Sequence, residues 1–167
     1  MPEKQTLERA QRDKRQGKAA STQAGEFVKE EMDHIREGKH GARSAKQAIA
    51  IGLSKARRSG VELKPPVEGS QRVRKRAARD YARGHGAPAK RKSTAKRVRA
   101  STQALKREGK GAASHQALAK QTRSAAKRRS ATSRSAAARK AVRTKGPAER
   151  SAAAKKAART RQSHAAA

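Results

Sequence analysis

The residues best suited to chemistry in this chain belong to a turn at positions 38–46, which reads Gly-Lys-His-Gly-Ala-Arg-Ser-Ala-Lys. Free backbone N–H groups at a helix N-terminus, together with the helix dipole, favour an anion such as a phosphate. The spacing of a nucleotide-binding P-loop is absent. The turn therefore predicts either a contact with a nucleic-acid phosphate or an ordinary connection between helices. The expected phosphate-binding residues of this turn and the helix after it are Lys39, His40, Arg43, Ser44, Lys46, Arg57 and Arg58.

A second set of basic residues forms clusters farther along the chain. Lysine and arginine bind phosphates without reading the base sequence, and each contact releases counterions. The alternative is a solvated run of charge that serves solubility, but blocks of like charge this long are usually interaction segments. The expected phosphate-binding residues of this part are Arg72, Arg74, Lys75, Arg76, Lys90, Arg91, Lys92, Lys96, Arg97, Lys127, Arg128, Arg129, Arg139, Lys140, Lys155 and Lys156.

The distribution of charge favours the same interpretation. The chain has 45 basic and 13 acidic residues, a formal net charge of +32 over 167 residues. Residues 1–69 contain 15 basic and 10 acidic residues, whereas residues 70–167 contain 30 and 3. A segment with so few acidic residues repels itself unless a polyanion lies beside it. We therefore expect DNA as the partner, with RNA as the alternative.

Other partners fit the sequence less well. The basic part lacks the bulky apolar face that interfacial helices insert into a membrane, and no secretory signal or membrane-spanning run is apparent. The chain has no cysteine, which excludes disulfides and thiolate metal sites. We expect a cytoplasmic, nucleoid-associated protein with no membrane partner and no small-molecule substrate.

Two helices are expected to position the turn. Apolar residues at helical spacing predict a first helix that ends at Gly38. Ser44 and Gln47 read as a capping box for a second helix, which ends at Gly60. The short connection between them predicts an antiparallel αα-hairpin over residues 21–66.

The composition predicts disorder outside this hairpin. Leu, Ile, Val and Phe together number 15 residues, and with this net charge the chain falls in the disordered class. The expected fold class is mostly α and disordered: a polar segment 1–20, an αα-hairpin module 21–66, and an Ala/Lys/Arg-rich low-complexity tail 67–167 that is disordered or transiently helical. Because the hairpin core is thin, we expect a homo-oligomer through the hairpin, a docked tail, or folding coupled to binding.

The first helix also presents an acidic ridge at the positions i, i+4, i+7 and i+11, opposite its apolar face. This ridge predicts either a solvated acidic face or a docking surface for the basic tail. Its members are Glu26, Glu30, Asp33 and Glu37.

Metal binding and catalysis are not expected. Glu31 and His34 match one Glu-x-x-His element of carboxylate-bridged metal bundles, but those sites need two such elements and two further glutamates. The other histidines show no ligand spacing. No nucleophile–base arrangement and no nucleotide fingerprint is present, and the core is too small to hold a catalytic site. We expect no metal, no cofactor and no enzymatic activity.

Internal repeats are visible. The decapeptide 135–144 recurs at 151–160, with two substitutions. The tetrapeptide Arg-Glu-Gly-Lys of the hairpin turn also recurs at 107–110. The second copy lacks the apolar residues of the hairpin, so it is either a decayed duplicate or a chance similarity in a biased sequence.

Two resemblances bear on function. The stretch from Glu26 to Gly60, with the core Arg-Glu-Gly-Lys-His-Gly-Ala-Arg-Ser followed by Lys-Gln-Ala-Ile-Ala-Ile-Gly-Leu-Ser-Lys-Ala-Arg-Arg, resembles a small bacterial family with a variable basic tail and no established function. The tail resembles bacterial histone H1-like proteins and the C-terminal domains of linker histones. That compositional likeness implies DNA binding and compaction, and assigns no residue.

Three functions follow as hypotheses. The first is a non-enzymatic, histone H1-like nucleoid-associated protein whose tail neutralises DNA phosphates without sequence preference. The second is an RNA- or ribosome-associated basic protein. The third is a protein-interaction or plasmid-maintenance module for which the tail is an anchor. With one Phe, one Tyr and no Trp, a base-stacking platform is not expected, which favours duplex DNA.

Overall fold

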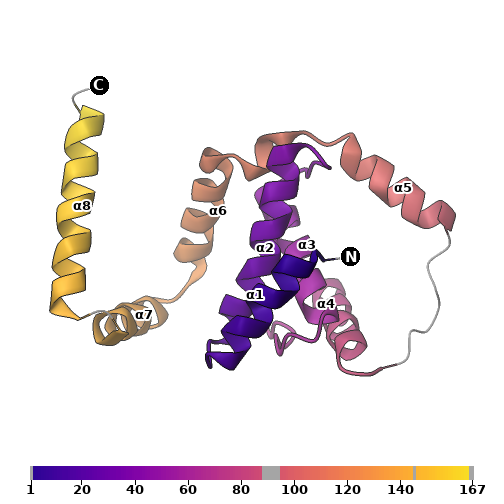
Figure 1. Ribbon diagram of the computed structural model, residues 1–167, viewed down its shortest axis with the longest axis horizontal. Helices are drawn as coiled ribbons and strands as arrows, with labels where there is room; N and C mark the ends of the chain where they lie inside the picture. The colour runs from indigo at the N-terminus through magenta and orange to yellow at the C-terminus, as the bar shows by residue number, and fades with distance from the viewer. Residues whose placement is uncertain (1, 88–94, 145, 166–167) are drawn as a thin grey trace. The chain divides into compact units, whose positions relative to one another are not determined.

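The computed structural model describes residues 2–87, 95–144 and 146–165, and within these ranges the chain is helical without a β-strand (Figure 1). By its internal contacts the chain divides into two units, Met1–Gln121 and Thr122–Ala167. The elements in chain order are α1 (Lys4–Arg15), α2 (Ala20–Glu37), α3 (Ala45–Arg58), α4 (Gln71–Gly84), α5 (Ala95–Lys106), the 3-10 helix η1 (Lys110–Ala113), α6 (His115–Arg128), α7 (Ala131–Thr144) and α8 (Pro147–Ala165).

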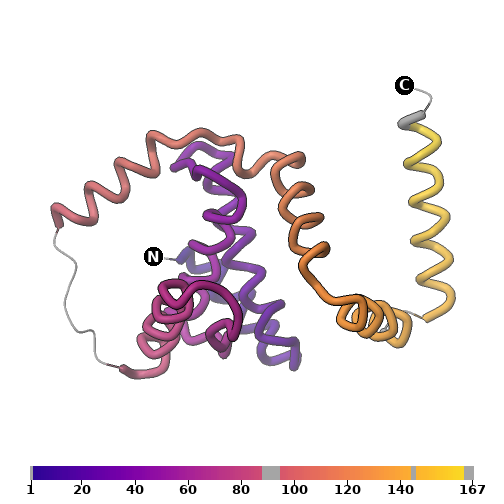
Figure 2. Tube along the Cα trace, turned by 180° about the vertical axis from the view of Figure 1, so that it is seen from behind, coloured from indigo at the N-terminus to yellow at the C-terminus, as the bar shows by residue number. Residues whose placement is uncertain are grey.

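Helix α2 is the centre of the first unit. Helices α1 and α3 pack against it, and α4 packs against α3; opposite views show α1 alongside α2 (Figures 1 and 2). The side chain of Phe27 is fully buried, in a cluster that includes Ala10 of α1 and Ala56 of α3. Farther along α2, Ile35 is fully buried in a second cluster that η1 completes through Ala112.

The helix ends around the turn follow local sequence rules. Gly38 ends α2 in the left-handed conformation with φ 81°, which costs glycine little. The Ser44 side chain accepts a hydrogen bond from the Gln47 N–H and caps α3, which confirms its predicted role. The Gln47 side chain reaches back to the Arg43 N–H at 3.0 Å rather than to that of Ser44. The two helices that were expected to form a hairpin are therefore present, joined by a capped turn.

The expectation of a long disordered, low-complexity tail is wrong. Five α-helices, α4 to α8, occupy most of the described residues after position 70. The composition explains the error, because alanine, arginine, lysine and glutamine are strong helix formers although they supply little core. Serines also cap these helices, since the side chains of Ser70, Ser114 and Ser130 each accept a hydrogen bond from the N–H three residues later.

The first 20 residues also differ from a simple polar segment. Helix α1 packs on α2, and Thr6, Ala10 and Asp13 are buried. The hairpin is therefore one part of a larger helical unit rather than a module that stands alone.

The repeats lie in helices. The copies at 135–144 and 151–160 fall within α7 and α8. The repeated Arg-Glu-Gly-Lys segment connects α5 to η1 and packs on the turn that it resembles. There the Gly41 N–H donates to the Leu105 carbonyl at 2.9 Å, and the Ala42 N–H to the Gly109 carbonyl at 3.4 Å. The two similar turns therefore contact each other, and a Cβ at Gly41 would lie 1.9 Å from a backbone oxygen of the second turn.

Close contact between α2 and α3 depends on Gly52. A Cβ at Gly52 would lie 2.7 Å from the Val28 Cα, whereas a Cβ at Gly25 meets nothing within 4 Å. The two glycines therefore offer a matched pair, one tightly packed and one free.

We predict that Gly52→Ala destabilises the protein by about 1–3 kcal/mol, because the added methyl group must separate the two helices. Gly25→Ala should stabilise the protein by about 0.5–1 kcal/mol through the higher helix propensity of alanine. Urea unfolding followed by circular dichroism measures both. Equal effects of the two substitutions would contradict the close contact between the helices.

Candidate nucleic-acid interface

Several backbone N–H groups of the hairpin turn are already engaged in hydrogen bonds. The Gly41 N–H donates to the Leu105 carbonyl at the end of α5, and the Ala42 N–H donates to the Gly109 carbonyl of the α5–η1 connection. The N–H groups of Arg43 and Gln47 bond side chains of the cap itself. With these four donors occupied, an anion at the turn would be held by side chains and by the N–H groups of Ala45 and Lys46, which the start of α3 leaves without intrahelical partners.

The basic side chains of the turn have different surroundings. Lys39 is half-exposed and pairs with Glu37 at 2.9 Å and with Glu3 at 3.1 Å. The hydrogen bond to Glu37 is the main reason that the pKa of Lys39 lies above its usual value. Arg43 and Lys46 are exposed. Only these last two are basic groups of the turn that face solvent without a described acidic partner.

Two further predicted residues lie at the end of α3. Arg57 is 9% exposed and donates through Nε to the Leu63 carbonyl at 3.1 Å. Burial lowers its pKa, and the side chain fixes the chain segment after α3 rather than facing a ligand. Arg58 is exposed and belongs to a basic hollow described next. Ser44 is used as a helix cap, and His40 faces the interior of the unit near Glu31.

Five arginines line a hollow of about 510 Å³ within the first unit. A single carboxylate, that of Asp80, lies among them. Asp80 accepts a hydrogen bond from the Ser54 hydroxyl at 2.6 Å and lies 3.9 Å from Arg58 Nε. One carboxylate cannot compensate five guanidinium groups, so the hollow has a positive potential. The arginines are Arg58 of α3, Arg76, Arg79 and Arg83 of α4, and Arg97 of α5.

Helix α4 supplies most of this charge in a continuous row. Arg72, Arg76, Arg79 and Arg83 follow the spacing i, i+4, i+7 and i+11, which places them on one side of the helix. Arg72 and Arg79 also line a second open hollow beside Lys75. The helix packs on α3 through its other side, where Ala77 is buried.

Sequence reasoning missed two members of this row, Arg79 and Arg83. The signal that identifies them is the helical spacing from Arg72 and Arg76. It was not used because the segment was expected to be disordered, and in a disordered chain spacing places no residues on a common side.

The other predicted tail residues lie on separate helices. Arg74 and Lys75 are exposed on α4, and Lys96 and Arg97 on α5. In the second unit, Arg139 and Lys140 are exposed on α7, and Lys155 and Lys156 on α8. At the end of α6, Arg128 and Arg129 donate to Ser124 and Ser133 beside an exposed Lys127. Lys90, Arg91 and Lys92 lie outside the described residues.

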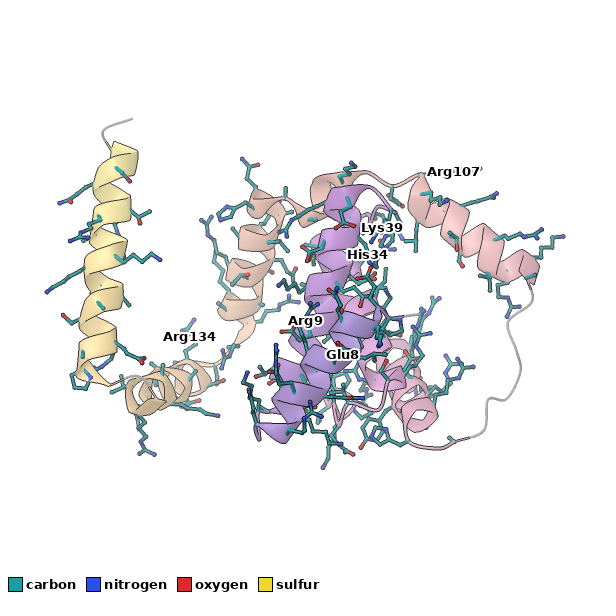
Figure 3. All side chains as sticks on the ribbon, in the orientation of Figure 1. Glu8, Arg9, His34, Lys39, Arg107 and Arg134 are labelled. Carbon is teal, nitrogen blue, oxygen red and sulfur yellow. The ribbon has the colours of Figure 1, made fainter. Side chains whose placement is uncertain are left out.

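Figure 3 shows how these side chains lie. Arg107 extends from the end of α5, and Arg134 extends from α7. The described side chains of α7 and α8 are almost all exposed. These helices therefore present basic groups on several sides rather than on one face.

The acidic ridge of α2 is largely occupied by neighbouring residues. Glu26 accepts a hydrogen bond from Arg9 of α1 at 2.7 Å. Asp33 pairs with Arg36 on its own helix at 3.1 Å. Glu37 pairs with Lys39, as described above. Glu30, at 3% exposure, is the most buried of the four.

A buried ion cluster joins α2 to α3. Lys55 Nζ lies 3.0 Å from Glu30 and also pairs with Glu31 Oε1. Burial would raise the pKa of Glu30, but hydrogen bonds from Lys55 and Thr6 outweigh it and hold that pKa below its usual value. Burial would lower the pKa of Lys55, but the two carboxylates outweigh burial and hold that pKa above its usual value. This cluster therefore stabilises the fold at neutral pH. Its contribution is lost as the pH falls through the folded pKa of Glu30 or rises through that of Lys55.

No family model, no curated protein and no solved structure matches this chain. The resemblances in sequence described above therefore stay predictions. Among the described helices, none combines the length and the hydropathy that crossing a membrane requires.

We predict that Lys55→Met destabilises the protein by about 3 kcal/mol, because it leaves two buried carboxylates without their ammonium partner. Lys29→Met removes the same charge from an exposed position of α2 and should change stability by less than about 0.5 kcal/mol. Urea unfolding at neutral pH compares the two variants. Similar stabilities would show that the cluster contributes little.

Proposed function

We propose that this protein binds nucleic acid without sequence preference, by placing arginines and lysines against backbone phosphates, and that its ligand is duplex DNA. The observation that supports this most directly is the arginine row of α4. Four guanidinium groups share one side of a helix whose other side packs on α3. Arginine binds phosphate with a planar, bidentate fork, so less side-chain entropy is lost per hydrogen bond formed than with lysine.

The dimensions of the row suit a duplex. From Arg72 to Arg83 the helix rises about 16 Å, which corresponds to about five base pairs at 3.4 Å each. Contacts of this kind position a protein on the backbone and provide no base readout. The expected binding is therefore electrostatic and steeply dependent on salt.

The second unit adds charge of the same kind. Residues 122–167 contain 14 basic residues and one acidic residue, Glu149. Their helices have little buried surface of their own. They supply phosphate contacts in addition to the row on α4, in a role like that of linker-histone tails but from helical segments.

The aromatic residues support a duplex over a single strand. Phe27 is fully buried. The ring of Tyr81 stacks on His85 with centroids 4.0 Å apart, and its hydroxyl donates to Glu62 at 2.9 Å. Recognition of single-stranded bases usually needs free aromatic faces; Phe27 provides none, and His85 covers one face of Tyr81. We propose a non-enzymatic, nucleoid-associated role on these grounds.

The test is a competition between duplex DNA and structured RNA. The full chain is titrated into each labelled ligand over a range of salt concentrations. The proposal is supported if DNA binds tightly and the logarithm of the binding constant falls linearly with the logarithm of the salt concentration. Clear preference for RNA would indicate an RNA-associated protein that uses the same contacts to phosphate. Absence of binding to both near physiological salt would refute the proposal.

We predict that the triple variant Arg76→Ala, Arg79→Ala and Arg83→Ala weakens DNA binding. The slope of log affinity against log salt should fall in magnitude by about 2–3, since each lost phosphate contact removes about 0.9. Alanine preserves the helix, so circular dichroism should be unchanged.

The matched control removes three exposed charges from the C-terminal end of α1: Arg12→Ala, Lys14→Ala and Arg15→Ala. This variant has the same net charge as the α4 variant. It should change the slope by less than about 1. Equal slopes for the two variants would show that affinity follows net charge alone and that DNA does not bind preferentially to α4.

A further inference from the structure

Glu31 is a fully buried carboxylate without adequate polar partners. It lies on α2 at 0% exposure, and neither oxygen accepts a hydrogen bond of normal geometry from the described residues. Lys55 lies beside Oε1 but is shared with Glu30. Two carboxylates thus face one ammonium group, and one negative charge of this buried cluster is not compensated by Lys55. Burial of such a charge is costly unless a further cation lies close to it.

Two histidines are the nearest remaining groups. His34 follows Glu31 by three residues on α2, and His40 returns to it from the turn. His34 Nδ1 lies 3.9 Å from Glu31 Oε1, and His40 Nε2 lies 3.6 Å from Glu31 Oε2. The ligating atoms of the three residues all lie within 4.8 Å of one another. Figure 3 shows His34 and Lys39 near the same end of α2.

The outer nitrogens of both rings identify the tautomers. His34 Nε2 lies 2.8 Å from a carboxylate oxygen of Glu3, and His40 Nδ1 lies 3.1 Å from the Gly41 carbonyl. Both oxygens only accept hydrogen bonds, so each outer nitrogen donates its hydrogen. In the neutral rings, the nitrogens nearest Glu31, which are His34 Nδ1 and His40 Nε2, then carry lone pairs that face the carboxylate. Lone pairs and a carboxylate repel each other unless a cation lies between them.

We propose that Glu31, His34 and His40 bind a divalent transition-metal ion of the zinc class. The ligand atoms are Glu31 Oε2, His34 Nδ1 and His40 Nε2, and water supplies a fourth ligand. Metal–ligand bonds of about 2.1 Å place tetrahedral ligands about 3.4 Å apart. His40 Nε2 already lies 3.6 Å from Glu31 Oε2, and ligand atoms of the three residues lie within 4.8 Å of one another, so they need to approach one another by at most about 1.4 Å.

The identity of the donors selects the class of metal. Two imidazoles and one carboxylate suit zinc and its neighbours, whereas calcium and magnesium prefer oxygen ligands alone. The surrounding groups match those of metal sites, because Glu3 and the Gly41 carbonyl orient the rings and Lys55 holds the other carboxylate oxygen. The metal would connect the last turn of α2 to the hairpin turn.

The histidine spacing explains why sequence reasoning rejected this site. His34 and His40 are six residues apart, which is not a helical spacing. The left-handed Gly38 reverses the chain and brings His40 back beside Glu31. The Glu-x-x-His element seen in the sequence is therefore completed by a residue of the turn, not by a second element of the same kind.

The test uses the full chain and Zn²⁺ alone, without nucleic acid, so that its result is independent of the proposed function. Calorimetric titration should show one Zn²⁺ per chain, and saturating Zn²⁺ should raise the unfolding temperature by about 5–10 °C. Replacement by Co²⁺ should give the visible absorption of a four-coordinate site with nitrogen and oxygen ligands.

Variants assign the ligands. The double variant His34→Gln and His40→Gln should weaken Zn²⁺ binding by at least about 100-fold and abolish the Co²⁺ absorption, and Glu3→Ala should weaken binding by about tenfold. The matched control, His85→Gln and His115→Gln, removes two exposed histidines and should leave the affinity unchanged. Circular dichroism of each metal-free variant establishes that it folds.

Two results would overturn the proposal. Equal Zn²⁺ affinity of the wild type and the His34/His40 variant would exclude these residues as ligands. Failure of Zn²⁺ to raise the unfolding temperature of the wild type would show that the folded protein binds no metal at Glu31.

Discussion

The scarcity of large apolar side chains is the constraint on which this fold depends. With 15 Leu, Ile, Val and Phe residues in 167, the helices cannot be separated by a thick apolar layer. They approach closely through alanine and glycine instead, and a Cβ at Gly52 would collide with the backbone of α2. Such packing gains dispersion energy from many short contacts rather than from a few large side chains. It also brings polar groups at the helix edges into the interior.

The buried ion cluster is a consequence of that close approach. Glu30 and Glu31 are adjacent on α2, so their side chains leave the helix about 100° apart. Because α1 covers one side and α3 the other, both carboxylates become buried. Lys55 reaches them from α3, and its long side chain fills space that a larger apolar residue would fill in an ordinary core. The fold thus uses ionic contacts where its sequence lacks apolar volume, and each such contact requires its partner to be present.

Local rules in the sequence predicted local structure, and composition misled where packing decides. Gly38 and Ser44 end and begin their helices as their residue types require. Disorder was expected after position 67 because counts of large apolar residues ignore alanine, which favours helix and allows close packing. The acidic ridge was placed opposite the apolar face of α2, since no sequence pattern shows that α1 covers that face. The site at Glu31 required His40, whose position depends on the path of a turn.

The two kinds of charge in this chain are separated by the fold. Acidic residues of α2 pair with neighbours inside the first unit, whereas α4 packs on α3 through small residues and keeps its arginines on the outer side. A Cβ at Gly84 would lie 2.0 Å from the Arg57 carbonyl, so α4 is held close to α3 at its C-terminal end. That attachment orients the arginine row, because rotating the helix would bury guanidinium groups at a cost of several kcal/mol each. The exposed position of the row is therefore a consequence of packing and does not need a ligand to establish it.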